Sequence, residues 1–482
     1  MKQDEIAIVW FRNDLRIADN PALSAALHQY QKILPVYIQA PDEHAPWEPG
    51  AASNWWLHHS LDSLNQSLNS IGSYLLLQNG DSLATLQALI NKTGAKAVFW
   101  NRMYEPALIN RDRNIKKLLK VAGIDCRSFN GHLLSEPQGI LNKAGSAFKV
   151  FSAYWKNTSR EINPTEEIIP APTAINSPRF ADLSTSLKQL NLLPDKNWYQ
   201  DFYDHWEPGE PAARKKIINL IEQTLSGYKI NHDIPSTSGT SRLSPHLHFG
   251  EISAREVFSV CQQSAPILKF PIADMEKFIS ELGWREFGYY LMYHFPDSTT
   301  QSLNQRFDLY GWLDDSKQTE LLEQWQQGKT GIPIVDAGMR ELWQTGWMHN
   351  RVRMITASIL TKNMGFHWIH GARWFWDTLV DADLAANTMG WQWTAGCGVD
   401  AAPYFRIFSP ARQTERFDPD GNYIKRWLPE LQHADKHVLT LGLPEATTKF
   451  DYPAPVIDLA VSRQAALLRW DSIKNSNHAL TD

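Results

Sequence analysis

The stretch that decides the fold of this chain reads GWMHNRVRM at residues 346–354, DADLAAN at 381–387, WQW at 391–393 and DAAPYFR at 400–406. Arginines, carboxylates, amides and large aromatic rings alternate here with apolar residues at helical spacing, which is typical of a pocket between helices. A buried charge destabilises the fold unless it is paired and hydrogen-bonded. We therefore expect Arg353 to pair with Asp381 or Asp383, in a deep pocket for a large, flat, polar and aromatic ligand.

Length and composition indicate a globular protein of two domains. The chain has 482 residues, which is too long for one ordinary core, and it is 43% hydrophobic and 21% charged. No run of about 18 apolar residues predicts a transmembrane helix, and the N-terminus lacks the basic and then apolar order of a secretion signal. The net charge of −5 means that any contact with nucleic acid must come from a local basic patch.

The three cysteines, Cys126, Cys261 and Cys397, lie far apart in the sequence. Their spacing matches neither a disulfide framework nor a zinc site. We expect free thiols in a reducing cytoplasm.

The first 130 residues predict an α/β domain with a parallel, five-stranded, Rossmann-like sheet. Short apolar runs at 6–11, 33–38, 74–77, 97–100 and 125–129 are expected strands, and the helical patterns between them are at 53–71, 83–90 and 109–121. Alternating strands and helices imply a sheet that is covered on both faces. Neither a dinucleotide fingerprint nor a P-loop follows the first strand, so a standard site of either kind is not indicated.

A connector and a helical domain are expected to follow. Residues 131–205 are rich in proline, serine, threonine and asparagine, and predict a surface connector with short helices near 151–155 and 183–190. Residues 206–476 predict an all-helical domain, with helices at 212–225, 275–293, 319–326, 333–345, 350–363, 367–381 and 462–475.

Three constellations in the helical domain have simple structural explanations. The loop at 239–245 has backbone N–H groups and hydroxyls that suit a phosphate, but serine and threonine are also common at a plain helix start. Glu281 and Arg285 are four residues apart and can pair on one helical face. The histidines at 246, 248 and 349 lack the spacing of a metal site, which leaves hydrogen-bonded structural histidines as the expectation.

Five motifs taken together resemble the photolyase/cryptochrome family, and within it the class I-like cyclobutane pyrimidine dimer photolyases. They are VWFRNDLR at 9–16, GTSRLSP at 239–245, ELGWREF at 281–287, GKTGIPIVD at 328–336 and the stretch from 346 to 410. The resemblance covers essentially the whole chain. It implies an N-terminal α/β domain for an antenna chromophore and a C-terminal helical domain for FAD.

The resemblance implies a set of cofactor-binding residues. Around the FAD phosphates it places Tyr228, Thr240, Ser241, Arg242, Leu243 and Ser244. Elsewhere along the cofactor it places Phe278, Glu281, Arg285, Asn350, Arg353, Asp381, Ala382, Asp383 and Asn387. Asn387 is expected beside flavin N5, where an amide can accept a hydrogen bond without adding charge.

The resemblance also implies residues for electron transfer and for the lesion. Trp391, Trp368 and Trp312 correspond to a chain of tryptophans that carries electrons to FAD. Trp284 and Trp393 are expected to pack on a flipped dimer, whose extrusion is favoured because damaged bases stack poorly. Glu281 is expected to hydrogen-bond the lesion in its protonated form. Asn350 and Met354 are expected to complete the pocket wall, and Arg351 and Arg406 are expected to contact DNA phosphates.

The implied activity is that of a deoxyribodipyrimidine photo-lyase, a carbon–carbon lyase that repairs dimers in damaged DNA with blue light. The alternatives are a cryptochrome photoreceptor, a (6-4) photolyase, which carries two histidines where this chain has Asn350 and Met354, and a generic flavin electron-transfer protein. Tyr104-Glu105-Pro106 departs from the folate pattern of the family. The antenna is therefore methenyltetrahydrofolate, 8-hydroxydeazaflavin, FMN or none. The resemblance implies a monomer without an obligate protein partner, in the cytosol or nucleoid of a bacterium.

Overall fold

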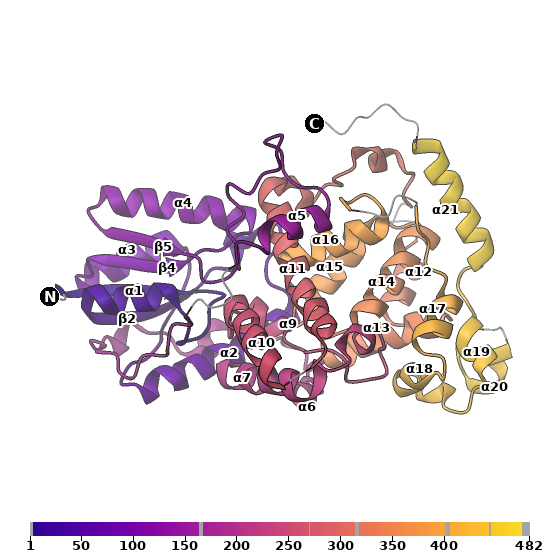
Figure 1. Ribbon diagram of the computed structural model, residues 1–482, viewed down its shortest axis with the longest axis horizontal. Helices are drawn as coiled ribbons and strands as arrows, with labels where there is room; N and C mark the ends of the chain where they lie inside the picture. Colours follow the sequence, from indigo (N-terminus) through magenta and orange to yellow (C-terminus); the bar gives the residue numbers. More distant parts are fainter. Residues whose placement is uncertain are drawn as a thin grey trace.

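The computed structural model describes residues 3–162, 167–268, 270–313, 318–400, 405–442 and 445–474. A sheet with its covering helices forms one end of the molecule, and a large group of helices forms the other end (Figure 1). None of the described helices is both long and apolar enough to cross a membrane.

The N-terminal half is the predicted parallel sheet of five strands. The strands are β1 (Gln3–Phe11), β2 (Tyr30–Gln39), β3 (Leu76–Asn79), β4 (Ala97–Asn101) and β5 (Asp125–Phe129). Their order is β3-β2-β1-β4-β5, and every pair is parallel. The fold class expected from the alternating pattern is confirmed.

Helices cover both faces of this sheet, as the continuous apolar strands require. They are α1 (Pro21–Gln29), α2 (Ala51–Ser70), α3 (Ser82–Thr93) and α4 (Pro106–Val121). Val9 and Phe11 of β1 pack in one cluster with residues of α1 and α2, whereas Ile8 and Trp10 pack in another with residues of α3 and α4. Because successive side chains of β1 point to opposite faces, this strand contributes apolar residues to both faces of the sheet.

The connector contacts both halves of the molecule. It contains α5 (Phe151–Thr158) and two short 3-10 turns, η2 (Ala181–Leu183) and η3 (Leu187–Leu190). The expectation of one helix over 183–190 is wrong. Ser184 accepts a hydrogen bond from the Leu77 amide of β3, and Ser186 caps the second turn separately. Pairing with the edge of the sheet therefore interrupts the helix.

The C-terminal half is helical, as predicted. Its first helices are α6 (Phe202–His205), α7 (Glu210–Asn219), α8 (Tyr228–Asn231), α9 (Ser244–His248), α10 (Ala254–Leu268) and α11 (Ile272–His294). They are followed by α12 (Thr319–Gln326), α13 (Pro333–Thr345), α14 (Asn350–Ser358), α15 (Trp368–Thr378) and α16 (Leu384–Ala395). The last ones are α17 (Pro410–Phe417), α18 (Asn422–Trp427), α19 (Lys436–Leu441), α20 (Glu445–Phe450) and α21 (Leu459–Ile473).

Helix boundaries differ from the predictions in two instructive ways. The helices expected over 212–225 and 350–363 each end in a π-helical turn, Leu220–Thr224 and Ile359–Asn363. The helix expected over 367–381 ends at Thr378, because Leu379 has an extended backbone. Asp381 lies beyond the end of this helix, where it pairs with Arg353.

Helix α16 lies inside the helical half and packs against α11, α14 and α15. These helices contribute to the largest apolar cluster, which includes Trp325, Trp368 and Trp391. The sequence elements expected to hold the ligand thus meet around one helix.

Candidate functional site

A polar network joins α14 to the segment before α16. Both oxygens of Asp381 accept from Arg353 Nη2, at 3.0 and 2.9 Å, and Arg353 Nε donates to the Met348 carbonyl at 2.7 Å. Ser244 Oγ, at the start of α9, donates to Asp381 Oδ2 at 2.6 Å. The predicted pair of Arg353 and Asp381 is confirmed. It brings three distant segments together at a single buried carboxylate.

Asp383 caps the N-terminus of α16. Its Oδ1 accepts from the Ala386 amide at 2.9 Å, and its Oδ2 accepts from the Tyr289 hydroxyl. Burial raises the pKa of Asp383, but His248, 3.5 Å away, and then Arg285 and Tyr289 outweigh it and hold the pKa below its ordinary value. Asp383 is therefore an anionic acceptor beside the site, while Ala382 between the two aspartates is buried.

Asn387 lies one helical turn after Asp383 on α16. Its Nδ2 donates to the Ala372 carbonyl of α15 at 2.9 Å. That bond uses the amide as a donor, so its Oδ1 is the acceptor left for a ligand. The predicted acceptor role of the amide is compatible with this orientation.

The loop at 239–244 holds its side chains in two different environments. Leu243 packs in an apolar cluster with Tyr228 and Phe278, so only its backbone is available to a ligand. Arg242 has a left-handed backbone with φ 53°, and its guanidinium lies over the rings of Trp347 and Trp206, at 4.0 and 5.3 Å. Thr240 and Ser241 are half-buried and Ser244 is exposed. Hydroxyls rather than the arginine are the groups that this loop presents.

Helix α11 carries Glu281, Trp284 and Arg285. Glu281 pairs with Lys277 on the same helix, so the alternative pairing with Arg285 is wrong. Arg285 faces the connector instead, where it donates to the His132 carbonyl at 3.1 Å and to Glu286 at 3.0 Å. Arg285 therefore links α11 to the connector rather than to Glu281.

The remaining predicted lesion residues lie on α14, α16 and the segment after it. Asn350 is exposed and Met354 is half-buried. Arg351 already pairs with Asp233 at 2.6 Å and lies over the Phe417 ring. Arg406 is held through its backbone carbonyl, which accepts from Lys362 Nζ. The arginine expected at phosphates on α14 is thus partly engaged within the protein.

One side of α16 is open to solvent. Ala386 is exposed, and a Cβ added at Gly390 would meet no atom of the described residues within 4 Å. Positions 386, 390 and 393 share a helical face, so half-buried Trp393 continues this side. Exposed Ser244 and Asn350 show that the neighbouring segments are open as well.

The three predicted electron-transfer tryptophans have different surroundings. Trp391 is buried, with its ring 4.9 Å from Phe375 and 6.1 Å from Trp325. Trp368 is fully buried, and the ring of His367 lies 5.5 Å from it and 5.1 Å from the ring of Trp312. Trp312 and Trp368 are thus joined through His367, a residue that the sequence reasoning did not include.

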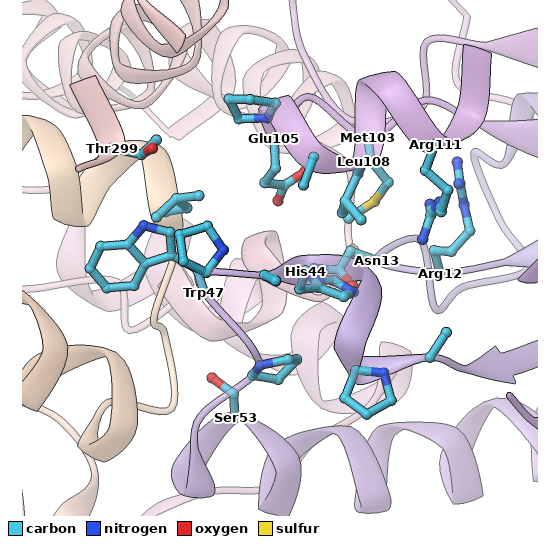
Figure 2. Close-up of a pocket in the computed structure, with 18 of the residues that line it drawn as sticks. Arg12, Asn13, His44, Trp47, Ser53, Met103, Glu105, Leu108, Arg111 and Thr299 are labelled. Carbon is cyan, nitrogen blue, oxygen red and sulfur yellow. The ribbon is translucent and has the colours of Figure 1, made fainter. Parts of the chain in front are cut away.

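A second site lies where the carboxyl ends of the strands meet the helical half. It is a cavity of 460 Å³. Figure 2 shows Arg12, His44, Trp47 and Glu105 around it. Trp376 of α15 completes the lining, with its ring 5.6 Å from that of Trp47. Sequence reasoning named Glu105 only as a departure from the folate pattern and missed His44, Trp47 and Trp376, although the ends of parallel strands are where ligands commonly bind in such sheets.

Two titratable groups that line this cavity have shifted pKa values, and two donors in it are unpaired. Burial lowers the pKa of His44 to about 4, so the imidazole is neutral at pH 7. Burial raises the pKa of Glu105. Trp47 Nε1 and Ser53 Oγ are buried and have no hydrogen-bond partner among the described residues. Unpaired buried donors of this kind are expected where a ligand supplies the acceptors.

Comparison with known proteins identifies the family. A family model described as DNA photolyase matches residues 7–173, and one described as FAD binding domain of DNA photolyase matches residues 278–472. A deoxyribodipyrimidine photo-lyase of Agrobacterium fabrum is 42% identical over 481 residues, which cover 97% of this chain and 98% of that protein. The chain belongs to the DNA photolyase family.

A photolyase structure and a cryptochrome are also similar to this chain. A crystal structure of a bacterial class III photolyase from Agrobacterium tumefaciens has a TM-score of 0.92 and 40% sequence identity, and the match covers 99% of both chains. Cryptochrome-2 of Arabidopsis thaliana is 37% identical over 485 residues, covering 96% of this chain and 78% of that protein. The cryptochrome is thus less similar than the photo-lyase of Agrobacterium fabrum.

The residues of the helical half fit the FAD that this photolyase domain implies. Asp383 is an anionic acceptor for a ring N–H group, and Asn387 retains an amide oxygen as an acceptor. Ser244 offers a hydroxyl at the exposed end of the Arg353–Asp381 network. Acceptors for ring nitrogens and hydroxyls for phosphates are the groups that a flavin dinucleotide requires.

Proposed function

We propose that this chain is a light-driven DNA photolyase that splits cyclobutane pyrimidine dimers. The observation that carries the proposal is the 42% identity, over nearly the full length of both chains, to a protein named deoxyribodipyrimidine photo-lyase. The open side of α16, with Trp393 at its end and exposed Ser244 and Asn350 on the neighbouring segments, supports binding of a flipped dimer beside a flavin.

The chain's own residues bind and orient in this proposal, and none acts as a nucleophile. The chemistry that bound, reduced FAD would supply is light-driven donation of an electron to the dimer, with recovery of that electron, so that no net oxidation or reduction takes place. Asn387 would hold the flavin ring edge through its amide oxygen, and Asp383 would accept from a ring N–H. Thr240, Ser241 and Ser244 would bind the phosphates.

The lesion-binding roles follow from the same placement. Trp284 and Trp393 would stack on the two damaged bases, which contributes about 1–3 kcal/mol per base. Glu281 would hydrogen-bond a thymine edge once its contact with Lys277 is exchanged for the lesion. Asn350 and Met354 would complete the wall, while Arg351 and Arg406 would meet phosphates.

Trp391, Trp368 and Trp312 would conduct electrons toward an oxidised flavin in this proposal. An indole can give up an electron without a metal. The burial of Trp368 and Trp391 supports the role, because it keeps water from reorganising around the charged ring.

The test is a repair assay with the flavin chemically reduced. A thymine-dimer oligonucleotide is added, and the base absorbance in the ultraviolet is followed under blue light and in darkness. A rise that requires light indicates restored thymines. Absence of a rise, with reduced flavin bound, contradicts the proposal and favours the second candidate, a blue-light photoreceptor, which the 37% identity to Cryptochrome-2 of Arabidopsis thaliana supports.

We further propose that the cavity at the strand ends binds an antenna chromophore. The two indoles of Trp47 and Trp376 can pack on a flat ring, and unpaired Trp47 Nε1 and Ser53 Oγ can donate to it. Methenyltetrahydrofolate, 8-hydroxydeazaflavin and FMN each have a planar ring that can accept hydrogen bonds from such donors.

Reconstitution with each of these three compounds tests the antenna site. One of them is expected to add an absorbance band that Trp47→Leu removes while the flavin spectrum is retained. The exposed Trp343 provides the matched control, and Trp343→Leu should keep the band. If no compound binds, or if Trp47→Leu binds as well as the wild type, the assignment of this cavity is wrong.

The subclass, the location and the assembly state remain part of the proposal. The similarity to a class III photolyase structure supports class III rather than the class I-like subclass that the sequence suggested. A monomer in the bacterial cytosol is proposed, and the three buried free cysteines are compatible with a reducing compartment. Sedimentation of the purified protein tests the monomer.

A further inference from the structure

The connector supports one of the two proposed lesion tryptophans. Phe151, the first residue of α5, stacks on the ring of Trp284 with centroids 3.8 Å apart and planes 12° apart. Trp155, one turn later, presses against α11, where a Cβ at Gly283 would lie 2.7 Å from its ring. One face of Trp284 is therefore covered by α5, which lies against α11 (Figure 1).

Asp400 connects this support to the other tryptophan. Its carbonyl oxygen accepts from Trp393 Nε1 at 3.0 Å, and its carboxylate Oδ2 accepts from the Phe151 amide at 3.1 Å. The carboxylate thereby satisfies an amide at the start of α5, where Val150 in the N-cap position provides no side-chain hydrogen bond. One residue thus holds both Trp393 and the helix behind Trp284.

The backbone of Asp400 makes this double contact possible. Its φ is 52°, in the left-handed region, which directs its carbonyl and its carboxylate to two different neighbours. Glycine adopts that conformation freely. Among the other residues, aspartate and asparagine adopt it most readily, because their side chains are short and polar. The preceding residue, Val399, packs in the same apolar cluster as Phe151 and Trp284.

We propose that Asp400 is a positioning residue that sets the spacing of Trp284 and Trp393, and so determines how tightly the dimer is bound. This inference rests on the proposed function. A stack of two bases requires a fixed gap between two aromatic planes, and Asp400 contacts both Trp393 and the helix behind Trp284. The connector, which precedes the helical half, thereby takes part in lesion recognition.

Asp400→Gly and Asp400→Asn separate this role from a general structural one. Glycine keeps the left-handed backbone and the carbonyl that holds Trp393, and removes only the carboxylate. Asparagine keeps an oxygen acceptor for the Phe151 amide and tolerates the same backbone conformation. Both substitutions remove one negative charge, so they are matched in their electrostatic effect on DNA.

The measurement is the Kd for a thymine-dimer oligonucleotide and for its undamaged counterpart, with FAD content and the repair yield at saturating DNA recorded in parallel. Losing a helix cap typically corresponds to about fivefold in an equilibrium constant, so Asp400→Gly is expected to weaken dimer binding by about fivefold. Binding of undamaged DNA, FAD content and the yield at saturation stay unchanged, and Asp400→Asn retains the wild-type Kd.

The wild type and Trp284→Ala serve as references that distinguish failure of this inference from failure of the proposed function. If the wild type does not discriminate dimer from undamaged DNA, the proposed function is wrong. If Trp284→Ala weakens dimer binding but Asp400→Gly does not, the inference is overturned and the function stands. Should Asp400→Gly fail to fold, Phe151→Leu replaces it, because it removes the stack and leaves the hydrogen bond. An unchanged dimer Kd in Phe151→Leu also overturns the inference.

Discussion

Glu286 is a buried carboxylate that joins α11 to the connector. It accepts from the amides of Leu134 and Ser135, at 2.8 and 3.2 Å, and from Arg285 at 3.0 Å. Burial raises its pKa to about 7, although Arg285 and the two amides act in the opposite direction. The folded protein therefore holds a proton at Glu286 in a pH range where the unfolded chain releases it.

This shift predicts how stability depends on pH. Because the pKa is raised on folding, the contribution of Glu286 to stability is fully present below about pH 4.5 and is lost as the pH rises through about 7. Glu286→Gln is permanently neutral and lacks this dependence. The difference in free energy of unfolding, wild type minus variant, should fall by up to about 3 kcal/mol between acidic and mildly alkaline pH.

Urea denaturation of both proteins across that pH range measures the difference. A difference that stays constant with pH, or that increases toward alkaline pH, contradicts the prediction. Other titrating groups are shared by the two proteins, so their effects cancel in the comparison.

At the scale of elements, the contact between α15 and α16 depends on a missing side chain. A Cβ at Gly371 of α15 would lie 2.0 Å from the ring of Trp391, so the indole fills the space that a side chain would occupy. Gly390 of α16 is different, because a Cβ there would meet no atom of the described residues within 4 Å. Packing between the two helices therefore requires glycine at position 371 but not at position 390.

Alanine substitutions at the two positions should have opposite effects. Gly371→Ala forces Trp391 or the helices apart and should lower the free energy of unfolding by about 1–3 kcal/mol. Gly390→Ala adds a methyl group in open space and should raise it by roughly 0.5–1 kcal/mol, because glycine is unfavourable inside a helix. Chemical denaturation with flavin content recorded checks both. Equal effects of the two substitutions would show that the indole does not limit the contact.

At the scale of the whole molecule, the two halves are joined through buried polar contacts. Arg16, in the loop after β1, donates to the carbonyls of Asp19, Gly131 and Gly250, at distances between 2.7 and 3.2 Å. These carbonyls belong to the α/β half, the connector and the helical half. Trp56 of α2 also donates across the interface, to Glu251 at 2.9 Å. Buried donors such as Arg16 and Trp56 therefore help to fix the orientation of the cavity at the strand ends relative to α16.

Arg16→Leu should destabilise the whole protein. It leaves three buried carbonyls without their donor, and removing one member of such a buried network lowers stability by about 3–5 kcal/mol. Arg113→Leu is the matched control, since Arg113 is exposed and bonds only to nearby Asn110. Calorimetry should show a lowered Tm for Arg16→Leu alone. A Tm equal to that of the control would mean that Arg16 is not needed to join the halves.

The local pattern of the sequence predicted the elements of this protein well. Apolar runs of strand length and apolar residues at helical spacing depend only on neighbouring residues, so the parallel sheet and most helices could be inferred from them. The Arg353–Asp381 pair was predictable too, because a buried charge requires an opposite one. The motifs indicated the family, because their order along the chain can be read from the sequence alone.

Contacts between distant residues were decided only by the tertiary structure. Nothing in the sequence indicates that Glu281 pairs with Lys277 rather than with Arg285, because both lie four residues away. Nor does it show that Asp400 reaches Phe151, 249 residues earlier, or that Trp47 and Trp376 meet at one cavity. Such pairings depend on how helices and sheet pack against one another, and periodicity along the chain carries no information about that packing. The sequence by itself determined the elements and the family of this protein, while tertiary packing determined which side chains share a site.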